Sequence, residues 1–294
     1  MIVQSDLSEK SAQEQLLEDL KDLPTLPTVV AQVMVTLNQT SSSAKDLERL
    51  IANDQAIAAK LLKLANSAFY GLPGKVNSLG RAITLLGFNT VRSMVLTIGV
   101  VTKFSGASRN EYFNRGDFWE HSLSVALASK LLATKDPSVN SEEAHIAGLL
   151  HDLGRIVFDF CKPVEFKDAL KRVREQSVNA RLAERESIGL SHDEIGSIVA
   201  VKWRFPEFIR ESMAFHHEPY KAVNYPGIVQ AVSLADSIVR SFKIQELNGQ
   251  DFSFPDVDMQ LEARFLPSPM HEEVFLTKYE VEVEKVRDIL RLFQ

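Results

Sequence analysis

The sequence predicts an all-α fold, and three observations support this class. Apolar residues recur at three- and four-residue spacing along most of the 294-residue chain, as the buried face of an amphipathic helix requires. Signals that end helices lie between these runs. Alternating runs typical of strands are scarce, and Pro255 interrupts the best of them, 252–257. We therefore expect helices joined by short connections.

The N-terminal part is predicted to contain several helices. The segment LPTLP at 23–27 is an extended lead-in, because proline lacks the amide hydrogen that a helix interior needs. A helix begins near Thr28, and apolar residues between Leu47 and Ala65 again recur with helical spacing. The segment GLPG, which follows Tyr70 directly, closes the helix that we expect to end at 69–70.

A polar, glycine-containing stretch at 105–114 separates the N-terminal helices from a second helical unit. We place the domain boundary there, which gives an N-terminal helical lobe at 1–108 and a helical core with a C-terminal extension at 109–294. Residues 246–270 are rich in proline, phenylalanine and acidic residues and are expected to form an irregular connection. A final helix at 272–293 is expected to pack back onto the core.

Composition excludes several classes of protein. With 45% hydrophobic and 24% charged residues, the chain is neither disordered nor fibrous. The longest apolar stretch, around 94–101, is far shorter than the ~20 residues of a membrane helix. The N-terminus lacks a signal sequence, and the single Cys161 fits a reducing compartment, so we expect a cytoplasmic protein without a membrane partner. A net charge of −6 argues against non-specific binding of nucleic acid.

Several titratable side chains occupy inward-facing helix positions. His121 is followed by apolar residues four and seven positions later, and His151 and Asp152 follow a buried apolar helix. Asp236 lies among apolar residues, where an isolated ionised carboxylate would cost several kcal/mol. Either Arg240, one helical turn later, or a metal ion would supply the compensating charge.

Three further histidines fall on two other helices. His192 follows the first residue of the capping-box sequence SHDE at 191–194, which places it in the first turn of a helix. His216 and His217 lie near the end of a helix that Pro219 stops. Imidazoles and carboxylates are the ligands that Zn, Mn and Fe prefer. Taken together, the residues predict a metal centre.

Each of these residues also has a simpler interpretation. His121 alone could be a hydrogen-bonded core residue, and His216 and His217 could be a surface pair that favours a helix C-terminus. Asp117, one turn before His121, either joins the metal cluster or stabilises the helix N-terminus. We assign structural roles to His145 and His271.

The sequence resembles the HD superfamily of phosphohydrolases, whose metal-binding pattern is matched by His121, His151-Asp152 and Asp236. The wider spacing with the other histidines is similar to the HD-GYP subgroup, whose additional histidines complete a two- or three-metal site. Three N-terminal segments resemble the HDOD family of bacterial signalling proteins, in which a helical lobe lies on an HD-like core: LPTLPTVVAQVM, ANDQAIAAKLLKLANSAFYG and SLGRAITLLGFNTVRSMVL. The resemblance covers about residues 20–245.

The resemblance implies that 109–294 is an HD-like metal-binding domain holding one or two divalent ions of Fe, Mn, Ni or Zn. Seven residues would bind them: His121, His151, Asp152, His192, His216, His217 and Asp236. Asp152 and Arg155 are the implied catalytic residues. Asp152 would bridge two ions that activate water, and Arg155, in place of the family's lysine, would clamp phosphate. The loop EPYKAVNYP departs from the HD-GYP pattern, so cyclic-dinucleotide hydrolysis does not carry over.

Three functions therefore stay open. The first is a metal-dependent phosphohydrolase or phosphodiesterase that acts on a phosphorylated small molecule or nucleotide. The second is a catalytically silent signal-transduction module that binds signalling proteins and whose metal is structural. The third is a helical scaffold without metal. A catalytic site needs an open metal position and a solvent path, whereas a closed coordination shell indicates a structural metal.

Overall fold

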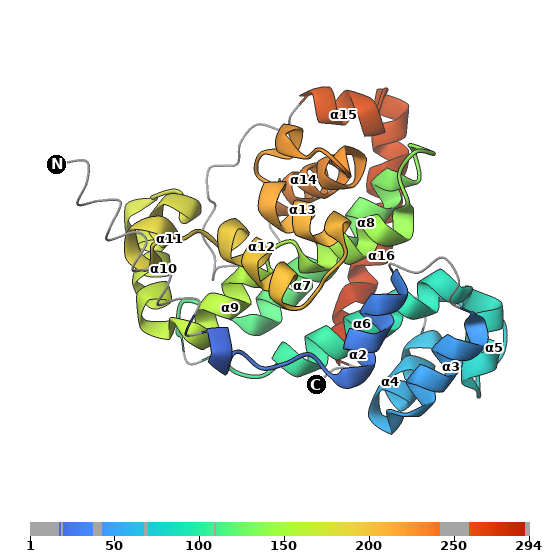
Figure 1. Cartoon of the computed structure of the whole chain (residues 1–294). Helices are drawn as coiled ribbons and strands as arrows, with labels where there is room; N and C mark the ends of the chain where they lie inside the picture. Colours follow the sequence, from blue (N-terminus) through green and yellow to red (C-terminus); the bar gives the residue numbers. More distant parts are fainter. Residues whose placement is uncertain are drawn as a thin grey trace.

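The computed structural model describes residues 18, 20–37, 43–67, 70–108, 110–241 and 259–291. Within these ranges every regular element is a helix, which confirms the predicted all-α class (Figure 1). The N-terminal elements are η1 (Leu20–Asp22), α2 (Thr28–Leu37), α3 (Ala44–Ala52), α4 (Gln55–Ala65), α5 (Leu79–Leu86) and α6 (Phe88–Phe104). The predicted strand-like run at 252–257 lies outside the described residues.

The central part of the chain forms a helical core. Its helices are α7 (Arg115–Ala133), α8 (Ser141–Leu150), α9 (Leu153–Cys161), α10 (Pro163–Gln176), α11 (Ala180–Ile188), α12 (His192–Lys202), α13 (Glu207–Phe215), η2 (Pro219–Lys221) and α14 (Pro226–Ser241). Helix α7 packs against α8 and α14, and α12 packs against α9 and α13. These packed pairs position the candidate site.

The apolar periodicity between Leu47 and Ala65 belongs to two helices. The side chain of Asp54 accepts a hydrogen bond from the backbone of Ile57 and so caps α4 after a break. Helix α4 ends at Ala65, so the predicted end at 69–70 is wrong. The reason is a contact across the following loop, because the side chain of Asn66 both donates to the carbonyl of Val76 at 2.7 Å and accepts from its amide at 2.8 Å.

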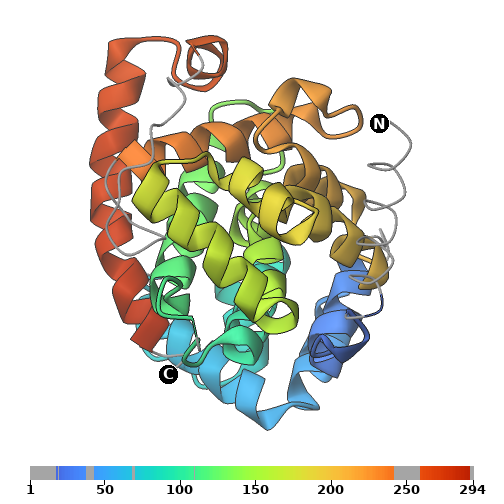
Figure 2. The same cartoon turned by 90° about the vertical axis from the view of Figure 1, so that its left-hand side faces the viewer.

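The C-terminal extension contains two helices, α15 (Met259–Phe265) and α16 (Pro269–Arg291). The predicted irregular connection at 246–270 is therefore wrong over α15, whose Arg264 contacts Asp136 at 2.7 Å. Helix α16 starts three residues before its predicted position, at Pro269. It runs along one side of the molecule and packs against α7 (Figure 2).

The buried apolar side chains form one cluster that extends from the N-terminal helices to α16. Helix α6 is central to it, since it packs against the N-terminal helices α2 and α4 and also against α8 of the core. The domain boundary near residue 108 stays a prediction. In the described part of the chain no single helix is long and apolar enough to cross a membrane; α5 and α6 reach that length only together, and they meet at a 119° bend.

Candidate metal centre

Six helices bring the predicted ligands to one buried place. His121 lies on α7, and the residues His151 and Asp152 form the junction between α8 and α9. His192 is the first residue of α12, where the predicted capping box is present. His216 follows α13 as its C-cap, and Asp236 lies on α14. The side chains of these six residues are buried, and that of the adjacent His217 is half-buried.

Asp152 lies at the middle of this arrangement. Its Oδ1 atom is 3.1 Å from Nε2 of His192 and 3.3 Å from Nε2 of His216. Its Oδ2 atom is 3.6 Å from Nε2 of His151. Two groups of possible metal ligands therefore share this carboxylate, and within each group the ligand atoms lie within 4.8 Å of one another. Group one consists of His121, His151 and Asp152, and group two consists of Asp152, His192, His216 and His217.

Asp236 lies beside group one. Its Oδ1 atom is 3.1 Å from Nε2 of His121 and 3.7 Å from Nε2 of His151. The same oxygen accepts a hydrogen bond from Nε of Arg240 at 2.8 Å. Burial alone would raise the pKa of Asp236, but Arg240 and the two histidines hold it well below its usual value. Asp236 is therefore an ionised carboxylate that both Arg240 and a metal ion could contact.

Backbone carbonyls orient two of the histidines. Nδ1 of His151 donates to the carbonyl of Gly148 at 2.7 Å, and Nδ1 of His216 lies 3.0 Å from the carbonyls of Ser212 and Met213. With the proton on Nδ1, the lone pair on Nε2 is available toward Asp152, as a metal-bound histidine requires. Both Nε2 atoms and both Asp152 oxygens have close polar neighbours but make no hydrogen bond of good geometry within the described part of the chain. These residues fit a metal ion.

The charge on Asp152 is also settled by its neighbours. Burial would raise the pKa of this carboxyl group, but Arg155 and His151 hold it well below its usual value. Nε of Arg155 lies 3.3 Å from Asp152 Oδ2, and the Arg155 side chain is 1% exposed. The carboxylate is thus ionised before any metal arrives.

The HDOD domain model matches residues 23–219, more than half of the chain. The chain belongs to the HDOD domain family. This membership agrees with the lobe-and-core resemblance of its sequence and with the all-helical architecture.

One solved structure of a similar protein supports the HDOD assignment, and a second supports the fold. An HDOD domain protein of unknown function from Geobacter sulfurreducens is 26% identical, with a TM-score of 0.80 over 98% of both chains. A protein from Shewanella amazonensis that has been proposed to be a phosphohydrolase is 22% identical, with a TM-score of 0.75 over 95% of this chain and 98% of that one. The second likeness shows the fold alone.

Similar sequences also occur in longer proteins. An uncharacterized protein of Treponema pallidum is 25% identical over 224 residues, which are 75% of this chain and 43% of that protein. The uncharacterized protein YuxH of Bacillus subtilis is 29% identical over 102 residues, 34% of this chain and 24% of that one. The HDOD chain thus aligns with less than half the length of either relative.

Two other residues singled out in the sequence do not join the ligand groups. Asp117 lies in the first turn of α7, where Asn114 caps the helix, and it belongs to neither group of the described residues. His145 lines a separate 20 Å³ cavity with Tyr70 and Thr97, which agrees with the structural role expected for it. The side chain of His271 lies outside the described part.

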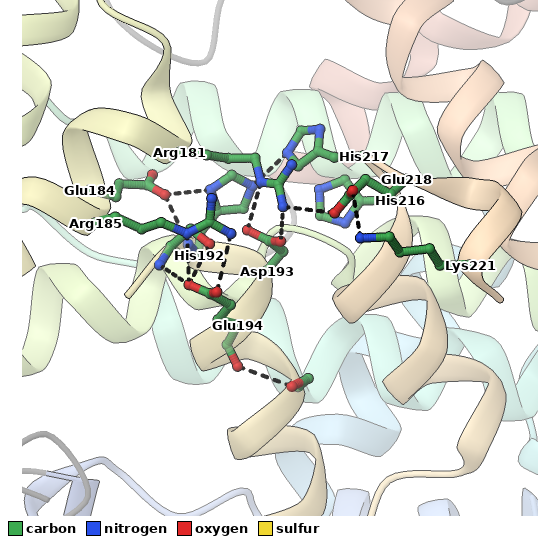
Figure 3. Close-up of polar contacts among 12 residues, drawn as sticks. Arg181, Glu184, Arg185, His192, Asp193, Glu194, His216, His217, Glu218 and Lys221 are labelled. Atoms are coloured by element: carbon green, nitrogen blue, oxygen red, sulfur yellow. Dashed lines mark hydrogen bonds and ion pairs between the residues drawn. The ribbon is translucent and has the colours of Figure 1, made fainter. Parts of the chain in front are cut away.

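Sequence reasoning missed Glu184 of α11. Its Oε2 atom accepts hydrogen bonds from the backbone amide of His192 at 2.8 Å and from Nδ1 of the same ring at 2.7 Å. The ring lies between Glu184 and His217 (Figure 3), whose Nε2 is 2.9 Å from Nε2 of His192. Burial would lower the pKa of His192, but Glu184 and Asp152 raise it to about 10. The one signal was that Glu184 precedes the apolar Ile188 by one helical turn on the buried face.

Replacing Glu184 by glutamine is expected to weaken metal binding. The amide oxygen can still accept both hydrogen bonds, but the lost charge makes the His192 ring less basic, and loss of such a partner costs about 10–100-fold in metal affinity. Competition with a chelating dye measures the affinity. Glu186→Gln, on the exposed face of the same helix, is the matched control. Equal affinities for the two variants would contradict this role of Glu184.

Gly154 is a second residue that the site requires and the sequence analysis missed. A Cβ atom at this position would lie 2.0 Å from the carbonyl oxygen of His192 and 2.8 Å from its carbonyl carbon. The N-termini of α9 and α12 approach here, and only glycine leaves room. No side-chain pattern signals such a backbone contact.

Gly154→Ala is therefore expected to displace His192 and to destabilise the protein by about 1–3 kcal/mol, the usual cost of overpacking. Denaturant unfolding gives the stability, and elemental analysis gives the metal content. Gly196→Ala is the control, because its Cβ atom would meet Cβ of Met213 at an ordinary 3.5 Å. A Gly154→Ala protein as stable as the control would refute the close approach.

Proposed function

We propose that this HDOD chain is a metal-dependent phosphohydrolase or phosphodiesterase that acts on a phosphorylated small molecule or nucleotide. The observation that carries the proposal is the buried Asp152 carboxylate between two groups of histidines. Bound divalent ions of Fe, Mn, Ni or Zn would supply Lewis acidity toward phosphoryl oxygens and lower the pKa of water. Seven residues would hold one or two ions: His121, His151, Asp152, His192, His216, His217 and Asp236.

The chain's own residues would prepare this chemistry. Arg155 keeps Asp152 ionised, and backbone carbonyls fix the His151 and His216 rings so that Nε2 faces the carboxylate. Burial and the neighbouring histidines hold the pKa of His217 well below its usual value, so this ring is neutral and able to bind a metal. Arg155 remains our candidate for contacting phosphate.

A regulatory function is the second candidate. After His217 the chain carries two exposed apolar side chains, since Tyr220 is 55% and Val223 is 79% exposed. The Glu211 carboxylate holds this loop in place by accepting hydrogen bonds from the amides of Asn224 and Tyr225. A fixed apolar loop beside the histidines suits binding of a signalling protein, with the metal structural. We place either function in cytoplasmic signal transduction.

Metal analysis followed by a phosphoester screen tests the proposal. The purified protein is expected to contain at least one transition metal ion per chain, and to cleave a chromogenic phosphodiester or phosphomonoester when Mn, Fe or Ni is supplied. His121→Ala is expected to lose the metal, whereas His145→Gln, outside the two groups, keeps it. A wild-type protein that takes up no metal would refute the proposal. Bound metal without turnover would favour the regulatory function.

A further inference from the structure

A second guanidinium group reaches both carboxylates of the centre. Arg240 lies in the last turn of α14, one helical turn after Asp236. Its Nε atom donates to Asp236 Oδ1 at 2.8 Å, and its Nη2 atom is 3.7 Å from Asp152 Oδ2. Arg240 is not one of the predicted metal ligands, and the proposed function gives it no role once metal is bound.

The charges of these groups balance. Asp152 and Asp236 each contribute one negative charge, and Arg155 and Arg240 each contribute one positive charge, so these four groups together are neutral. The positive charge of the His192 ring is offset by the Glu184 carboxylate, which lies 2.7 Å from it. A divalent ion would add two positive charges to this buried place, where like charges repel strongly because little water screens them. A loaded centre therefore needs either an anion or the displacement of one guanidinium.

Arg240 is the guanidinium that can respond. The side chain of Arg155 is 1% exposed, whereas that of Arg240 is 18% exposed and stands at the end of its helix. Arg240 and the candidate ligand His121 both lie close to the same oxygen atom, because Asp236 Oδ1 is also 3.1 Å from Nε2 of His121. An ion held by His121 and Asp236 would compete with Arg240 for this oxygen.

We propose that Arg240 has two roles, as the counter-ion of Asp236 before metal binds and as a ligand for phosphoryl oxygens after metal has taken that carboxylate. The inference rests on the proposed function and names a residue of this chain that would bind the phosphoryl oxygens of its substrate. A guanidinium group presents paired N–H donors that match two phosphate oxygens, and its long side chain lets it turn from Asp236 to an anion beside the metal.

Titrations with Mn²⁺ and with inorganic phosphate test both roles. Arg240→Gln is expected to bind Mn²⁺ several-fold more tightly than wild type, because no cation competes for Asp236. The Mn²⁺-loaded variant is expected to bind phosphate at least 10-fold more weakly. Arg210→Gln, which removes an exposed arginine on the neighbouring α13, is the matched control and is expected to change neither affinity.

Arg240→Lys covers the case in which the glutamine variant does not fold. Lysine keeps the charge but lacks the paired donors, so Mn²⁺ affinity is expected to stay near wild type while phosphate affinity falls. Phosphate affinity equal to wild type in the lysine variant would overturn the phosphate role. Unchanged Mn²⁺ affinity in a folded glutamine variant would overturn the counter-ion role. Wild-type protein that binds no Mn²⁺, Fe²⁺, Ni²⁺ or Zn²⁺ would refute the proposed function itself.

Discussion

Asp152→Asn is expected to remove metal from both ligand groups at once. The carboxylate oxygens lie 3.1–3.6 Å from the Nε2 atoms of His192, His216 and His151, so both groups use this one side chain. An amide carries no charge and is a weaker ligand. We expect metal affinity to fall by more than about 100-fold, since even an outer partner of a ligand contributes about 10–100-fold. Elemental analysis and chelator competition measure the loss, and phosphoesterase activity should fall with it.

The same substitution is expected to destabilise the protein without metal. Arg155 is 1% exposed beside Asp152, and breaking a buried ion pair costs about 3–5 kcal/mol. Asp159→Asn is the matched control, because Asp159 is also buried and pairs with Arg115, and neither residue belongs to a ligand group. The control should lose stability but keep its metal. If the Asp152→Asn protein kept a metal in either group, the conclusion that both groups need the Asp152 carboxylate would be wrong.

The helical class and the inward-facing positions of several candidate ligands could be predicted because both depend on local patterns, whereas the full set of seven ligands was what the resemblance to the HD superfamily implied. Helical periodicity needs only neighbouring residues, and inward-facing histidines such as His121 follow from the same periodicity. A carboxylate on an otherwise apolar helix face, which needs a compensating positive charge, likewise signalled Asp236. These features need no knowledge of how the helices pack, and the structure brings the predicted residues together; their binding of metal stays a prediction.

The features that the sequence did not reveal depend on contacts between distant segments. Helix α4 ends early because Asn66 bonds across a loop to Val76. Gly154 is required because another helix approaches its backbone, and Glu184 acts on His192 from a different helix. Each effect arises where two elements meet, so periodicity along one element cannot report it.

Asp236 was predicted to need either Arg240 or a metal ion, and the structure places it within reach of both. Nε of Arg240 is 2.8 Å from its Oδ1 atom, and Nε2 of His121 is 3.1 Å from the same atom. The two interpretations therefore describe two forms of one protein. Melting or denaturant curves of wild type and Asp236→Asn, each with and without chelator, separate their contributions.

With chelator, Asp236→Asn is expected to lose about 1.5–3 kcal/mol, because a hydrogen bond to a charged partner is replaced by one to a neutral amide. With metal the loss should be larger, since the variant also forfeits the stabilisation that bound metal gives the folded state, about 2.7 kcal/mol at a metal concentration 100 times Kd. Asp136→Asn is the matched control, because Asp136 pairs with Arg264 and belongs to neither ligand group. This variant should lose the same free energy of unfolding with and without chelator. Equal losses for Asp236→Asn with and without chelator would show that Arg240 alone compensates this carboxylate and that Asp236 holds no metal.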